Sequence, residues 1–140
     1  MLSDFFNRDL ARNSVGVGWR HLIDAVFNKI ELGKTPWDDV VVLQVKEKFG
    51  TLRIYYSGGD DYVRGFIDAL ESASAHSCEE CGSSSGQTTA HMGRWLTLCS
   101  RCMVQREKRE CRELKRAVRR AWWRKQWNKF VQFIDELTSF

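Results

Sequence analysis

Two pairs of closely spaced cysteines constrain the fold of this chain more than any other feature of its sequence. Two residues separate Cys78 from Cys81, two separate Cys99 from Cys102, and 17 residues lie between the pairs. A two-residue gap lets both sulfur atoms of a pair reach one ion from a tight turn, and Gly82 supplies the permissive backbone that such a turn often needs. The spacing is typical of zinc ribbons, so we predict one zinc ion held by four thiolates.

The chemistry of four thiolates predicts a structural role for this metal. Thiolates are soft ligands, and four of them leave no open position for a substrate water. The metal would replace a core that so short a segment cannot build. Iron in the same cage and oxidised cysteines remain alternatives, and His76 and His91 are alternative ligands. The fifth cysteine, Cys111, falls on the apolar stripe of the next expected helix, which favours a buried, inert thiol.

The composition as a whole is that of a globular protein. The 140 residues fit one compact domain, or a small domain with a long appendage. No run approaches the roughly 18 consecutive apolar residues of a membrane span, and residues 1–9 lack the basic start and apolar core of a secretion signal. We therefore expect no membrane partner and a cytoplasmic protein, whose paired cysteines hold a metal rather than forming disulfides.

The first part of the chain begins with helical periodicity. We expect a short helix over residues 2–12, followed by a second helix that Asn13 or Ser14 caps. Apolar residues at three- and four-residue spacing give this second helix one buried face. Gly33 is well placed to end it.

The residues after this second helix show the alternating periodicity of β-strands. Alternation predicts strands over residues 38–46 and 51–56, joined by a turn at residues 47–50, and hence a β-hairpin. The side of the first strand expected to be buried carries Val41, Leu43 and Val45. Asp60 or Asp61 can cap a further helix that runs to about residue 75.

These elements predict an α+β fold with three regions. A helix–β-hairpin–helix body occupies residues 1–76, and the zinc ribbon occupies residues 77–102. Residues 103–140 form a basic, tryptophan-rich C-terminal helix, since neither glycine nor proline follows Gly93. This helix either runs unbroken or breaks near residues 121–123.

Charge is distributed unevenly along the chain. Residues 101–130 carry 12 basic and three acidic side chains, a net of +9, whereas residues 1–100 have a net charge of −3. A solvated face would mix the two signs, so we predict a surface that binds nucleic acid, a nucleoprotein complex or an acidic protein. The residues expected to form it are Arg106, Arg109, Arg112, Arg116, Arg119, Arg120 and Arg124.

Two further surfaces follow from the pattern. The exposed hairpin face offers a second candidate contact patch, made of Lys46, Lys48, Arg53 and Tyr55. In the C-terminal helix, the first apolar side carries Val104, Cys111, Leu114, Val118 and Trp122. A later apolar set, rotated by roughly 120° at 100° per residue, consists of Trp123, Trp127, Phe130, Ile134 and Leu137. We expect the tail to fold back on the body or to pair with a second copy in a homodimer.

The sequences of several segments resemble those of a known protein family. The segments are residues 44–56 (QVKEKFGTLRIYY), residues 77–82 (SCEECG) and residues 93–99 (GRWLTLC). Together they resemble small uncharacterised zinc-ribbon proteins found widely in phages and bacteria, over residues 17–102, while the basic tail lies beyond the resemblance. The resemblance implies a phage-type accessory protein in the host cytoplasm, and such proteins often bind and block a host complex.

The sequence therefore predicts a non-enzymatic, zinc-stabilised binding protein that contacts nucleic acid or a nucleoprotein through its arginine-rich helix. An alternative is an inhibitor or adaptor that grips a host protein, such as a defence complex. A third hypothesis is a divergent nuclease of the His-Asn-His type that uses His91. Ala90 precedes His91, and no asparagine lies between the cysteine pairs to complete that motif.

Overall fold

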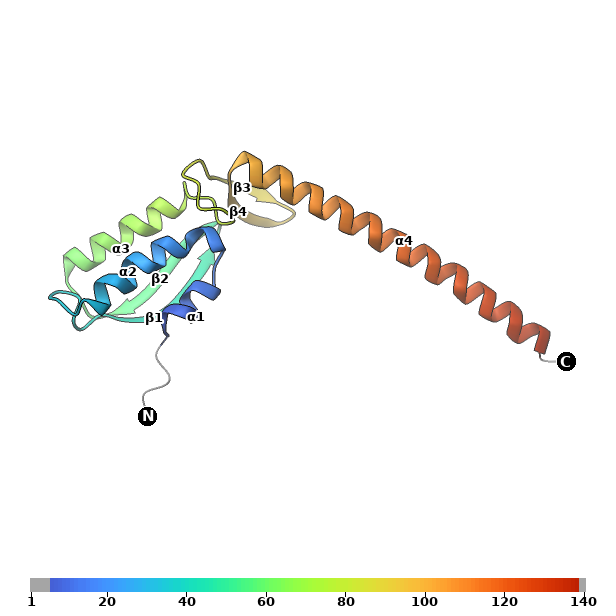
Figure 1. Cartoon of the computed structure of the whole chain (residues 1–140), viewed down its shortest axis with the longest axis horizontal. Coiled ribbons are helices and arrows are strands. Elements are labelled where there is room, and N and C mark those ends of the chain that lie inside the picture. The colour runs from blue at the N-terminus through green and yellow to red at the C-terminus, as the bar shows by residue number, and fades with distance from the viewer. Residues whose placement is uncertain (1–5, 139–140) are drawn as a thin grey trace. The chain divides into compact units, whose positions relative to one another are not determined.

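A computed structural model describes residues 6–138 of the chain and shows an α+β protein with two antiparallel hairpins and one long helix (Figure 1). The chain divides into two compact units, Met1–Met103 and Val104–Phe140. The α+β class, the hairpins and the long C-terminal helix confirm the prediction. In chain order the elements are α1 (Arg8–Asn13), the 3-10 helix η1 (Val17–Trp19), α2 (Arg20–Glu31), β1 (Val41–Lys48), β2 (Thr51–Ser57), α3 (Asp61–Ser74), β3 (Gln87–His91), β4 (Arg94–Leu98) and α4 (Ser100–Thr138).

Local capping explains where the N-terminal helices begin and end. The Asn7 side chain accepts a hydrogen bond from the Leu10 N–H and starts α1, while residues 2–5 of the expected first helix lie outside the described residues. The prediction that Asn13 or Ser14 caps the second helix is wrong, because both residues lie at the C-terminal end of α1 and α2 follows η1. Gly33, at φ +56°, comes just after α2 as expected.

The first hairpin turns more tightly than its sequence indicates. Lys48 pairs with Thr51, so only Phe49 and Gly50 form the turn, with φ angles of 53° and 75°. The pairing shifts register between Val42 and Gln44. This bulge turns Leu43 outward, to 56% exposure. The expectation that Leu43 shares the buried side with Val45 is therefore wrong.

Helices and sheet share a core in the first unit. The largest fully buried side chains there include Trp19, Ile23, Val26, Leu52, Val63 and Ile67. They come from η1, α2, β2 and α3, whose ribbons lie together in Figure 1. Asp60 caps α3 by accepting hydrogen bonds from the N–H groups of Tyr62 and Val63, as predicted.

Side chains of helix α3 also accept hydrogen bonds from the backbone N–H groups along one edge of β2. The Leu52 N–H donates to Ser74 Oγ at 2.8 Å, and the Ile54 N–H donates to Glu71 Oε1 at 2.7 Å. The same Glu71 carboxylate forms an ion pair with Arg53 at 3.1 Å. Two backbone donors that an edge strand would leave open are therefore bound within the fold.

Helix α4 is continuous through residues 121–123, so of the two predicted forms the structure has the unbroken one. It runs for 39 residues, about 58 Å at 1.5 Å per residue, and does not stop at residues 121–123. Charged residues interrupt its apolar positions. Within residues 6–138, no helix combines the length and the apolar character that crossing a membrane requires.

The Ser74 hydroxyl provides a test of this packing. Replacing Ser74 by alanine should lower the free energy of unfolding by about 1–3 kcal/mol, because the buried Leu52 N–H loses its acceptor. Urea unfolding followed by circular dichroism measures the change. Ser72→Ala, on the exposed side of the same helix, serves as the control and should have a much smaller effect. Equal losses in the two variants would contradict the role given to the Ser74 hydrogen bond.

Candidate metal centre

Four cysteine sulfur atoms from two separate turns meet in one place. The Sγ atoms of Cys78, Cys81, Cys99 and Cys102 all lie within 4.8 Å of one another. Cys81 Sγ and Cys99 Sγ are 3.7 Å apart. Four sulfurs bound at 2.3 Å around one tetrahedral ion would be separated by about 3.8 Å. The cluster therefore fits a single metal ion with four thiolate ligands.

Local hydrogen bonds shape the turn that holds the first pair. The Gly82 N–H donates to the Cys78 carbonyl at 2.8 Å, and the Cys78 N–H donates to the Ser83 carbonyl at 2.8 Å. Gly82 has a φ of +77°, which glycine adopts without the strain that a Cβ would bring. The second pair joins two regular elements, since Cys99 follows β4 and Cys102 lies in the first turn of α4.

The sulfur cluster is largely shielded from solvent. Cys78, Cys99 and Cys102 are buried among Leu96, Leu98 and Met103, whereas Cys81 is exposed. A backbone hydrogen bond from Cys102 lowers the pKa of the Cys99 thiol to about 7, while burial raises the pKa of the Cys102 thiol. A bound cation favours the thiolate form of every ligand.

The first cysteine turn is held against the N-terminal segment by direct backbone contact. The Gly18 N–H donates to the Glu79 carbonyl at 2.8 Å, and the Glu79 N–H donates to the Thr97 carbonyl at 2.8 Å. A Cβ at Gly18 would collide with the Cys78 carbonyl, and one at Gly16 would collide with the Glu79 carbonyl. Both glycines therefore permit this approach, which the local sequence does not signal because the contact is with residues about 60 positions later.

Two buried polar side chains complete the attachment of the ribbon. Trp19 is fully buried, and its indole N–H donates to the Ser77 carbonyl at 2.6 Å. Thr97 is also fully buried, and its hydroxyl donates to the carbonyl of Gly50 in the β1–β2 turn. The cysteine turn and the β3–β4 hairpin are thus fixed to the core of the first unit by hydrogen bonds with buried donors.

The other residues singled out from sequence lie apart from the sulfur cluster. In the second candidate patch, Lys46 Nζ lies 4.6 Å from the centre of the Tyr55 ring, and Lys48 Nζ lies 5.6 Å from the centre of the Phe49 ring. Arg53 instead forms an ion pair with Glu71 of α3. The structure therefore brings Lys46 and Tyr55 together but engages Arg53 within the fold.

The arginines predicted to form a binding surface all lie on α4, and all except Arg106 are exposed. Arg106 is half-buried and forms an ion pair with Glu110 at 3.2 Å. Cys111 is exposed, so the expectation of a buried thiol is wrong. Its helical stripe is apolar, but the described residues of the second unit contain no other element to cover it.

The alternative histidine ligands lie outside the sulfur cluster. His91 pairs with Arg94 across the β3–β4 turn, and His76 follows α3. Among residues 6–138, the metal-compatible group consists of the four cysteines alone. Four thiolates would complete a tetrahedral coordination sphere and leave no open position for a substrate.

No family model, curated protein or solved structure matches the chain.

The first prediction for this site concerns its metal. Protein purified without added metal should contain close to one metal ion per chain by elemental analysis, and Cys99→Ser should lose most of it. Cys111→Ser is the matched control and should retain the metal, because Cys111 is outside the cluster. A metal-free chain with an unchanged circular dichroism spectrum and melting temperature would contradict the assignment.

The second prediction concerns the glycine contact. Gly18→Ala should lower the free energy of unfolding by about 1–3 kcal/mol or more, because the added methyl group overpacks a buried backbone contact. Thermal unfolding of the metal-loaded chain measures this loss. Gly65→Ala, in the open middle of α3, should instead be neutral or stabilising by up to about 1 kcal/mol. Similar stability of the two variants would show that the Gly18 contact is unimportant.

Proposed function

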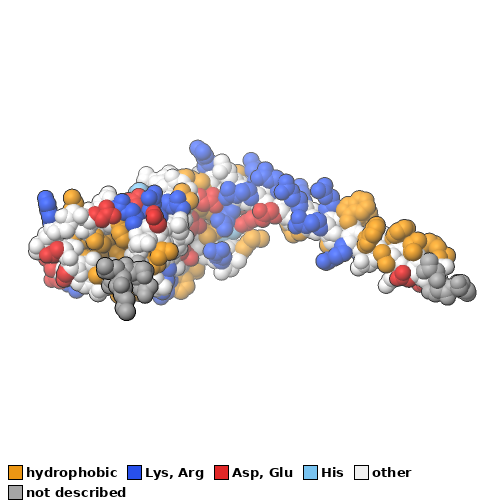
Figure 2. Space-filling view, turned by 60° about the horizontal axis from the view of Figure 1, so that its bottom comes forward, with side chains coloured by type: hydrophobic (Ala, Val, Ile, Leu, Met, Phe, Trp, Pro, Cys, Tyr) orange, Lys and Arg blue, Asp and Glu red, His pale blue; other side chains and the backbone are white. Residues whose placement is uncertain are grey.

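We propose that this chain is a non-enzymatic, zinc-stabilised binding protein that contacts nucleic acid, or a nucleoprotein complex, through the basic stretch of α4. The basic stretch is residues 101–130, with its net charge of +9. The observation that carries the proposal is that this charge lies on one continuous helix whose arginines beyond Arg106 are exposed to solvent. Figure 2 shows blue basic side chains clustered along the first half of α4.

Zinc is the metal best suited to the four-cysteine cluster. Soft thiolate ligands in a tetrahedral set favour zinc or iron over the oxygen-seeking magnesium and calcium. Zinc has no redox chemistry and fills closed four-cysteine sites in small ribbons that cannot fold alone. Most of this cluster is buried against a small apolar core, in keeping with a structural ion.

The arginines of the basic stretch are arranged in a regular line. Arg112, Arg116, Arg120 and Arg124 recur at every fourth residue, so each advances about 6 Å along the helix with only a slow turn around it. A guanidinium group can hold a phosphate through two parallel hydrogen bonds. The line therefore suits an extended, repeating polyanion such as a nucleic-acid backbone.

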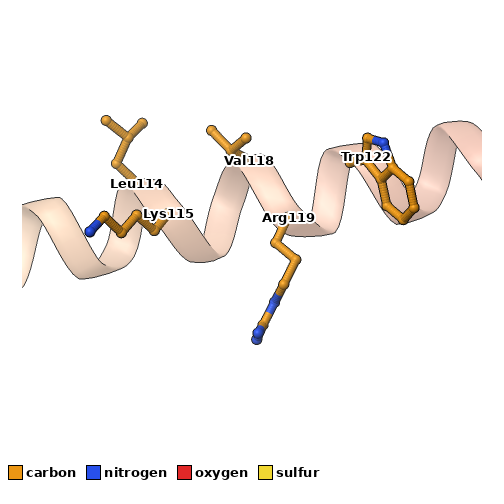
Figure 3. Close-up of a pocket in the computed structure, with 5 residues that line it drawn as sticks. All are labelled: Leu114, Lys115, Val118, Arg119 and Trp122. Atoms are coloured by element: carbon orange, nitrogen blue, oxygen red, sulfur yellow. The ribbon is translucent and has the colours of Figure 1, made fainter.

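The basic line is separate from the first apolar side of the helix. At 100° per residue, Arg116 lies about 160° around the helix from both Leu114 and Val118. Figure 3 shows Leu114 and Val118 projecting to one side of α4, while the side chain of the neighbouring Arg119 projects to the other. A phosphate backbone can therefore be bound without desolvating Leu114 or Val118. Phosphate contacts position a protein but do not read bases, so the proposal implies little sequence preference.

One observation favours the alternative, an inhibitor or adaptor that binds a protein. Leu114, Val118 and Trp122 form a shallow, open apolar surface beside Lys115 and Arg119. Apolar side chains rimmed by cations would suit a protein surface with an acidic edge. Such a host complex would survive nuclease treatment after affinity capture, whereas a complex bridged by nucleic acid would be lost.

The proposed function predicts a steep salt dependence. If about four phosphates are neutralised, the affinity for duplex DNA should fall roughly a hundredfold between 50 and 200 mM salt, and fluorescence anisotropy measures it. The double variant Arg116→Gln, Arg120→Gln should reduce the slope of log K against log salt by about 2. Lys125→Gln lies on another side of the same helix and should change the slope less. A loss of less than about tenfold across this range would contradict the proposal.

A further inference from the structure

The C-terminal part of α4 exposes a row of large apolar side chains that we call the C-terminal seam: Trp123, Trp127, Phe130, Ile134 and Leu137. Trp123 is 62% exposed, Trp127 65% and Leu137 60%. Figure 2 shows orange apolar atoms dominating this end of the helix. Within the second unit, residues 104–138 form this helix alone, so no other described element of that unit covers these tryptophans.

The spacing of the seam is that of a coiled coil. Its members are separated by four, three, four and three residues, which is the alternation that keeps one stripe facing a partner helix. Val131 and Phe133 flank the stripe and are also exposed. A seam of this type is completed by another helix of similar length and periodicity, and a second α4 has both.

The exposed area is large enough for a specific interface. Trp123, Trp127, Phe130 and Phe133 are each exposed by between one half and two thirds. At the usual size of aromatic side chains they offer on the order of 500 Å² per copy, before the aliphatic residues are added. Two copies would then bury roughly 1,000 Å² or more, which is the scale at which a specific interface becomes stable.

Charge selects the relative direction of the two helices. Arg116 and Arg120 continue the line of the seam toward the N-terminal side, so a parallel pair would place each arginine opposite its own copy. An antiparallel pair separates these arginines. It also brings the end of the helix that carries Asp135 and Glu136 alongside the basic stretch of the partner.

We propose that a second copy of this chain covers the C-terminal seam, in an antiparallel pair of α4 helices with Trp127 of each copy packed near Phe130 of the other. This register keeps all five seam residues inside the contact. It leaves residues 101–118 of the two copies outside the overlap, toward opposite ends of the pair. The inference concerns self-association and does not rest on the proposed function.

Sedimentation equilibrium of the full, metal-loaded chain tests the pairing. The wild-type chain should be a dimer at about 100 μM, and Trp127→Glu should weaken association by at least roughly thirtyfold, because it places a charge at the centre of the interface. Leu114→Glu is the control, on the other apolar side of the same helix and outside the overlap of the pair, and should remain a dimer. Circular dichroism should show an unchanged helix content in both variants.

Two outcomes would overturn the pairing. The first is a monomeric wild-type chain at this concentration, and the second is dissociation by Leu114→Glu but not by Trp127→Glu. In the first case, the monomeric chain can also be tested for binding to unpaired nucleic acid that is lost in Trp127→Glu. That result would make the seam a stacking surface for bases instead.

The exposed thiol of Cys111 provides an independent measurement of direction. A spin label on Cys111 can be attached while the metal protects the other four cysteines. In the antiparallel register the two labels lie 35 residues apart along the helix axes, about 50 Å at 1.5 Å per residue. A parallel pair would place them about 10 Å apart, as neighbouring helices are. Pulsed electron resonance separates the two distances, and the short one would overturn the antiparallel arrangement.

Discussion

The peptide groups around Glu79 hold together segments that are far apart in the sequence. The Glu79 carbonyl accepts a hydrogen bond from the Gly18 N–H in η1, and the Glu79 N–H donates to the Thr97 carbonyl in β4. The Thr97 hydroxyl donates a hydrogen bond to the Gly50 carbonyl, in the tight turn of the first hairpin. The metal ligands can converge only if these strands and turns keep their places. The backbone contacts thus position the ligands, and a bound metal would in return hold the contacts together.

The sequence was most informative where chemistry is local. The cysteine spacing, the cap at Asp60 and the glycine that follows α2 could each be predicted, because each depends on a few neighbouring residues. Features decided by distant contacts could not be predicted. The bulge at Leu43 depends on pairing with β2, and the need for glycine at position 18 depends on a turn 60 residues later. The exposure of Cys111 could not be predicted, because an apolar stripe predicts a covering element and the described residues of the second unit contain none.

The continuity of α4 illustrates a different limit of periodicity. The apolar side of the helix changes at Trp122 and Trp123, whose rings meet edge to face with centroids 5.0 Å apart. This change suggested either a break or two packing directions. Backbone propensity decides between them, because the segment is rich in alanine, arginine and lysine and contains no glycine or proline. Side-chain patterning alone shows which faces of a helix are apolar. It does not show whether the backbone bends so that another element can pack against them.

The uninterrupted helix also fixes how its surfaces are oriented relative to one another. Arg116, Arg120, Trp123 and Trp127 follow one line along α4, and only helical periodicity keeps them in phase. Inserting one residue after Arg120 would rotate everything beyond it by 100°, whereas inserting seven would nearly restore the alignment. The position of a residue along the helix therefore determines the side of the helix on which it lies. An insertion changes the relative orientation of the two surfaces through the rotation it introduces, more than through the length it adds.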